Sequence, residues 1–156
     1  MYHELSRAVL RLAVAAALGM FVGFERERSE KAAGVRTFAL LSLAAAVFVV
    51  LERPLLLALG GLLVVVLGGL LGARAVFGER DGLALTTSSS MLVAYGVGAL
   101  AGSGELVIAV AVGVVTALLL VSKRELHGLA ETLSREEVRA AAQFAIIGFV
   151  VYPLLP

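Results

Sequence analysis

The stretch LLLALGGLLVVVLGGLLGA, residues 55–73, decides the class of fold. It contains no charged residue, and Pro54 and Arg74 bound it on either side. About 20 apolar residues in a helix cross the roughly 30 Å hydrocarbon core of a bilayer. We therefore expect this segment to be a transmembrane helix.

The rest of the chain repeats the pattern, since 60% of its 156 residues are hydrophobic, only 16% are charged and the mean hydropathy is +1.00. Six crossings with short loops would use nearly all of it. We predict an all-α fold in a single domain, residues 1–156: a polytopic transmembrane bundle of about six helices with short loops. The expected helices are roughly 8–24, 35–51, 55–73, 83–101, 106–121 and 140–155.

Basic residues are divided unequally between the two sides of this arrangement. One side would carry ten, in the first, third and fifth loops, whereas the other carries only Arg7, Arg11 and Arg53. The positive-inside rule then predicts a multi-pass protein of the cell (inner) membrane with both termini outside. Arg11 lies about one turn inside the first run, and we expect its long side chain to reach the headgroups.

The fifth loop contains more structure than a linker. Ser134 followed by Glu137 has the spacing of a capping box, which starts the last helix before it enters the membrane. Ahead of it, Leu126, Leu129, Ala130 and Leu133 form an apolar stripe at helical spacing. We expect a short interfacial helix over residues 125–133.

Glycines recur four residues apart in three of the predicted helices. Such pairs let helix backbones approach closely inside a membrane. Packing within the bundle is the favoured interpretation, and an oligomer interface or a pore lining is the alternative. The positions are Gly19, Gly23, Gly68, Gly72, Gly98 and Gly102.

Charges gather in GFERER, residues 23–28, at the end of the first helix. Glu25 and Glu27 could attract a divalent cation or take part in proton transfer. The alternative is a solvated loop of mutually neutralising charges. Arg36 opens the second helix at the same boundary, where it could pair with Glu25.

A second polar stretch, TTSSS at residues 86–90, lies inside the fourth helix. Five consecutive hydroxyls encircle a helix, so some of them must face protein or water. The run could break the helix and coordinate an ion, as in transporters, or supply hydrogen bonds between helices.

Several other kinds of chemistry have no support in the sequence. The chain has no cysteine, and its two histidines, His3 and His127, lie outside the apolar runs. No set of nucleophile, base and orienting residue is present, and the basic loops are short and mixed with acids. We expect no enzymatic activity, no cofactor and no nucleic-acid partner.

The chain resembles the MgtC/SapB membrane proteins, and most closely the N-terminal half of larger relatives that carry an uncharacterised conserved membrane domain. The resemblance rests on residues 23–27 (GFERE), 34–37 (GVRT) and 85–87 (LTT), and continues through 123–127, 133–139, 143–145 and 153–156. The chain departs from MgtC in lacking an aspartate-containing stretch between the second and third helices and a soluble C-terminal domain. The larger relatives continue with a second block of helices.

The resemblance implies a role in magnesium homeostasis. We expect a transporter or channel subunit for a small ion, possibly a divalent cation such as magnesium, embedded in the lipid bilayer. It would work as a homo-oligomer, with a dimer as first expectation, or with a separately encoded companion membrane protein. The alternative is a non-conducting regulator that binds another membrane complex. The residues expected to bind or gate the ion are Glu25, Glu27, Arg36, Thr37, Thr86, Thr87 and Ser88, with Glu25 and Glu27 as candidate metal ligands.

Overall fold

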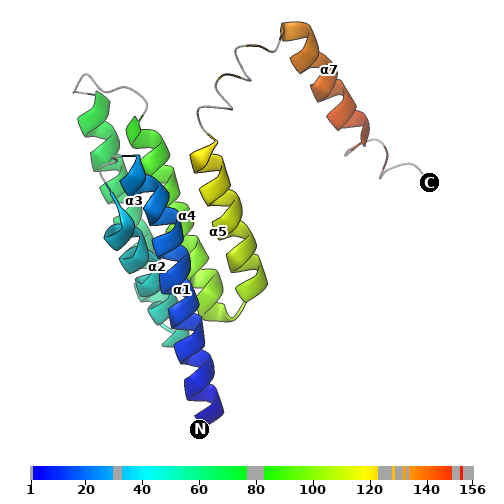
Figure 1. Ribbon diagram of the computed structural model, residues 1–156. Coiled ribbons are helices and arrows are strands. Elements are labelled where there is room, and N and C mark those ends of the chain that lie inside the picture. Colours follow the sequence, from blue (N-terminus) through cyan, green and yellow to red (C-terminus); the bar gives the residue numbers. More distant parts are fainter. Residues whose placement is uncertain are drawn as a thin grey trace. The chain divides into compact units, whose positions relative to one another are not determined.

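The computed structural model describes residues 2–29, 33–76, 83–122, 128, 132, 134–148 and 152, and within them it is all-helical (Figure 1). This confirms the predicted fold class. The chain forms two compact units, Met1–Val121 and Ser122–Pro156. The first contains α1 (Tyr2–Arg28), α2 (Val35–Val50), α3 (Pro54–Val76), α4 (Leu83–Ser103) and α5 (Leu106–Val121), and the second contains α7 (Arg135–Ile146).

The helix bounds follow the apolar runs closely for α2 and α5, but α1 is longer at both ends than the predicted 8–24. The charged residues 25–28 continue the helix because Glu and Arg are good helix formers. The predicted interfacial helix, 125–133, lies outside the described residues apart from Gly128 and Thr132. The apolar run predicted from residue 140 begins within α7, which itself starts at Arg135, and the structure describes the chain continuously from there to residue 148.

Two helices are long and apolar enough to cross a membrane by length and composition, over His3–Arg28 and Pro54–Ala73. The apolar helices α2 and α5 are shorter. Along α3 most leucines and valines point outward, and Val64 is the large apolar side chain that the helix buries. Exposed apolar surface of this extent on a soluble monomer would be unusual, whereas a lipid-facing helix requires it.

Helix α4 occupies the centre of the first unit, because it contacts α1, α2, α3 and α5. Close approach depends on glycine at several positions. A Cβ on Gly19 would lie 2.6 Å from the Phe38 carbonyl oxygen, and one on Gly23 would lie 2.6 Å from the Val35 Cα. A Cβ on Gly98 would overlap the Ser42 carbonyl group.

These contacts fix the register of three helices. Gly19 of α1 contacts Ser42 of α2, whereas Gly23, further along α1, contacts Val35, which comes earlier in α2. The two helices are therefore antiparallel. On α4, Gly98 lies against Ser42 and Gly102 against Ala46, so α4 runs parallel to α2. The Ser42 hydroxyl joins this interface by donating a 2.7 Å hydrogen bond to the Ala15 carbonyl oxygen.

The second unit shows the predicted capping box. The Ser134 hydroxyl accepts a hydrogen bond from the Glu137 backbone N–H at 3.2 Å, and the Glu137 carboxylate accepts one from the Ser134 backbone N–H at 2.8 Å. Each of these bonds satisfies a donor that the first turn of a helix would otherwise leave unpaired. The predicted start of the last helix is thereby confirmed.

Candidate ion site at one end of the bundle

The centre of the candidate site is a buried arginine. Ala15, Gly19, Val22 and Arg26 follow each other along α1 at spacings of four, three and four residues, which places them on one face of the helix. That face packs into the bundle, and Arg26 is only 2% exposed. A charged residue therefore continues the apolar stripe by which α1 joins the core.

Glu25 neutralises this buried charge. The Arg26 Nε donates to the Glu25 Oε2 at 2.9 Å, and the Ser29 hydroxyl donates to the Glu25 Oε1 at 2.8 Å. Both carboxylate oxygens of Glu25 are thus engaged, and its side chain is 12% exposed. Arg26 lies in the last turn of α1, where the helix dipole also favours a cation.

Glu27 performs a different task on the same helix. Its Oε2 accepts a 3.0 Å hydrogen bond from the backbone N–H of Val35, the first residue of α2. A Cβ on Gly34 would lie 2.7 Å from that same carboxylate oxygen, so glycine makes room for the contact. Glu27 consequently ties the start of α2 to the end of α1.

The structure arranges the other charged candidates differently from the pairing suggested by the sequence. Glu25 forms its ion pair with Arg26, whereas Arg36 lies exposed in the first turn of α2. Thr37 is half-buried beside it. Glu25 and Glu27 are two residues apart on a helix, so their carboxylates do not face each other. No cluster of three or more histidine or acidic residues occurs within the described part of the chain.

The hydroxyl run is continuous α-helix at the start of α4, without a break. Thr87 and Ser90 are 2% and 4% exposed, Thr86 and Ser88 are half-buried, and Ser89 is exposed. The Ser88 hydroxyl donates to the Gly68 carbonyl oxygen of α3 at 2.6 Å, and Ser90 donates to the Thr87 carbonyl oxygen at 2.8 Å. Part of the run therefore bonds α4 to a neighbouring helix and part faces the interior.

The register of the helices places the Glu25–Arg26 pair and the hydroxyl run of α4 at the same level of the bundle. Gly23 of α1 lies against Val35 of α2. Because residues 42 and 46 of α2 lie against residues 98 and 102 of α4, Val35 is level with residue 91 of α4. One further turn along α1 reaches Arg26, which corresponds to the turn of α4 that contains Thr87 and Ser88. The end of α1 and the start of α4 lie at the same end of the unit (Figure 1).

The glycine pairs predicted from the sequence differ in their surroundings. Gly19, Gly23, Gly98 and Gly102 lie against backbone or side-chain atoms of α2, and Gly68 lies against Ser88. Gly72 has no atom within 4 Å of the place where a Cβ would be. Four of the six positions thus belong to the interface of α1 and α4 with α2.

Comparison with known proteins places this architecture in a family. Residues 12–129, more than half of the chain, match the MgtC family. The chain belongs to the MgtC family. No match was found among curated proteins or among solved structures. Membership indicates a membrane protein linked to magnesium or ion homeostasis, in agreement with the two helices of membrane-spanning length.

In this MgtC-family chain, the sequence analysis missed Arg26 as a site residue. It was grouped with Glu25, Glu27 and Arg28 as one run of charges, although only Arg26 continues the buried face of α1. The signal was available, since Arg26 follows Val22 by four residues and Gly19 by seven. Extending the helical periodicity of an apolar run into its charged flank would have found it.

Proposed function

We propose that this MgtC-family chain is a subunit of a membrane transporter or channel for a small ion, with a divalent cation such as magnesium as the first candidate. The observation that carries the proposal is the burial of Arg26 beside Glu25, at the level of the α4 hydroxyls. Ionisable residues inside membrane bundles are costly and commonly mark ion pathways.

The chemistry of the pair supports gating by competition. Glu25 holds Arg26 with both of its carboxylate oxygens occupied, and we assign this arrangement to the closed state. A cation that approaches Glu25 must replace the guanidinium group, and carboxylate together with hydroxyl and carbonyl oxygens forms the ligand set that hard divalent cations prefer. Thr86, Thr87 and Ser88 would line the path, while Glu27, Arg36 and Thr37 would shape its mouth.

The working unit would contain more than one chain. A path for an ion is readily built between subunits of a symmetric oligomer, for which a homodimer is the commonest form. The outward-facing leucines and valines of α3 form an apolar face that another helix would cover in such an oligomer. A separately encoded companion membrane protein would meet the same need.

A second candidate function is a non-conducting regulator that binds another membrane complex. One observation favours it: within the described residues, every buried side-chain nitrogen or oxygen has a hydrogen-bond partner. A fully satisfied polar interior stabilises one packed arrangement and needs no ion. For this function Arg26 and Glu25 would have a purely architectural role.

Flux into liposomes reconstituted with the purified protein separates the two functions, provided that folding is controlled. Glu25→Gln alone leaves a buried Arg26 without its counter-charge, which costs about 3–5 kcal/mol when one partner of a buried pair is removed. The double variant Glu25→Gln/Arg26→Gln removes both charges and avoids that penalty. It is therefore the variant whose flux reports on function.

We expect divalent-cation flux from the wild type and at least about a tenfold loss in the folded double variant, because a tenfold change corresponds to only about 1.4 kcal/mol at the site. Arg28→Gln, at an exposed position in the last turn of α1, is the matched control for removing a positive charge near the pair. Undiminished flux in the double variant would refute the gating role, and absence of flux from folded wild type would favour the regulator or a transporter subunit that needs its companion protein.

A further inference from the structure

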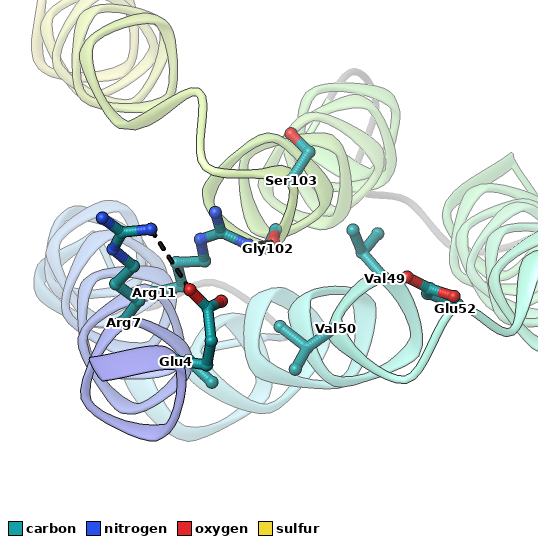
Figure 2. A pocket seen from close by; sticks show the side chains of 9 residues that line it. Glu4, Arg7, Arg11, Val49, Val50, Glu52, Gly102 and Ser103 are labelled. Atoms are coloured by element: carbon teal, nitrogen blue, oxygen red, sulfur yellow. Dashed lines mark hydrogen bonds and ion pairs between the residues drawn. The ribbon is translucent and has the colours of Figure 1, made fainter. Parts of the chain in front are cut away.

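A polar cavity of about 420 Å³ is lined by residues of α1, α2 and α4 (Figure 2). It lies near the start of α1, whereas Arg26 is in the last turn of that helix. It is formed where α1 begins and where α2 and α4 end. Its volume falls in the range typical of small-molecule sites. The lining residues that matter here are Glu4, Arg7, Arg11, Glu52 and Ser103.

The cavity offers charges of both signs. Arg7 pairs with Glu4 at 3.3 Å on the exposed rim, whereas Arg11 is half-buried and its Nη1 lies 3.4 Å from the Gly102 carbonyl oxygen at the end of α4. The Glu52 side chain makes no hydrogen bond or ion pair with any residue in the described ranges. An anionic group would meet Arg11, and a cationic group would meet Glu52.

An apolar groove of about 570 Å³ adjoins this cavity. Val49 and Ser103 line both of them, so the cavity and the groove adjoin at these two residues. The groove runs along α4, past Leu100, Gly96 and Val93, with Leu57 of α3 and Val112 of α5 also lining it. Gly96 has no atom within 4 Å of its Cβ position, which leaves the groove open at that point.

The length of the groove matches the depth of one bilayer leaflet. Val93 and Ser103 are ten residues apart on α4, which corresponds to about 15 Å of helix. This is half of the roughly 30 Å hydrocarbon thickness of a bilayer, the depth of one leaflet. A packed helix from a second copy would need a groove that continues along the bundle, whereas an acyl chain ends at mid-membrane.

We propose that the cavity and the adjoining groove together bind one phospholipid with an amine-bearing headgroup, such as phosphatidylethanolamine. Arg11 binds the phosphate, Glu52 binds the ammonium group, and one acyl chain lies in the groove over Gly96. The lipid fills the space between α3 and α5 in the leaflet next to the cavity. The proposal requires a membrane-embedded bundle and does not depend on ion transport.

Native mass spectrometry of the full chain in detergent, mixed with phosphatidylethanolamine or phosphatidylglycerol, tests the site. We expect wild type to retain one phosphatidylethanolamine per chain. Gly96→Leu places an apolar side chain in the groove, at a position where a Cβ meets no atom within 4 Å, and should weaken retention about tenfold, which corresponds to about 1.4 kcal/mol. Gly69→Leu is the matched control, because Gly69 also has open space but lies on α3 outside the groove.

The headgroup contacts are tested separately. Glu52→Gln should abolish the preference for phosphatidylethanolamine over phosphatidylglycerol, and Arg11→Gln should weaken both lipids. Free phosphoethanolamine, which lacks acyl chains, should not displace the lipid. Equal retention by Gly96→Leu and wild type, displacement by phosphoethanolamine, or a lipid-free dimer would each overturn the proposal. If Arg11→Gln fails to fold, the Gly96→Leu and Glu52→Gln results still decide it.

Discussion

At the scale of single residues, Arg26 and Gly98 show how polarity and size are used inside this bundle. Arg26 occupies a place on α1 that an apolar side chain would fill in an ordinary helix interface, and Glu25 accompanies it. A buried pair of this kind is a weak source of stability, because desolvation offsets most of the attraction. Its retention in the interior therefore argues for a specific task and supports our assignment of the pair to the ion path.

Gly98 leads to a prediction about packing. A Cβ at this position would overlap the Ser42 carbonyl group, so Gly98→Ala must push α4 away from α2. Overpacking of a close contact costs about 1–3 kcal/mol, and we expect a lower thermal unfolding temperature in detergent. Gly69→Ala is the control, since nothing lies within 4 Å of that Cβ and alanine favours the helix by up to about 1 kcal/mol. Equal unfolding temperatures for the two variants would contradict the close packing of α2 and α4.

At the scale of elements, α7 owes its start to two residues. The backbone N–H and the hydroxyl of Ser134 both donate to the Glu137 carboxylate, and these bonds lower the pKa of Glu137 below its ordinary value of 4.5. A lowered carboxylate pKa in the folded state contributes stability above 4.5 and loses it as the pH falls through the folded value. The start of α7 should therefore fray only in acid, below pH 4.5.

An NMR titration of the Glu137 amide in micelles measures this effect. The wild-type midpoint should lie below 4.5, and Ser134→Ala should move it part of the way back, because the backbone N–H still donates. Arg139→Ala, outside the capping box, serves as the control and should leave the midpoint unchanged. An identical midpoint in wild type and Ser134→Ala would show that the hydroxyl does not bind the carboxylate.

The elements also show what sequence periodicity could and could not predict. The start of α2 at Val35, both ends of α5 and the cap at Ser134 were predictable, because apolar runs and capping residues are local signals. The continuation of α1 through Arg28 was missed because its charges were interpreted as a loop, although the helical periodicity extends into them. The Glu25–Arg26 pair, the cavity at Arg11 and the groove at Gly96 depend on how helices pack, and a single sequence does not contain that register.

At the scale of the whole molecule, the first unit has two polar ends and an apolar outer surface. Arg26 and the hydroxyls lie towards one end, and Arg11 with Glu52 at the other. Between them α3 and α5 expose leucine and valine side chains. This distribution suits a bundle that spans a bilayer, with the proposed ion path opening at one face and the proposed lipid bound at the other.

The direction of that bundle in the membrane is our last prediction. Ten of the thirteen basic residues fall in the first, third and fifth loops predicted from the sequence, so the positive-inside rule predicts that the Arg26 end of α1 faces the cytoplasm and that both termini lie outside. The natural chain has no cysteine, so an introduced cysteine can be labelled without a background reaction from other thiols of the protein. Glu105→Cys, in the turn between α4 and α5, should react with a membrane-impermeant maleimide applied to intact cells. Arg28→Cys, exposed at the end of α1, should react only after permeabilisation.

The two positions control for each other, because both side chains are exposed and they lie at opposite ends of the same unit. Reversed labelling would mean that the basic loops face outward, and the proposed gate would then open to the outside. Labelling of both cysteines in intact cells would contradict a membrane-spanning bundle altogether. The expected pattern would leave Glu25 and Arg26 at the cytoplasmic mouth, so an ion released by the pair would enter or leave the cell interior directly.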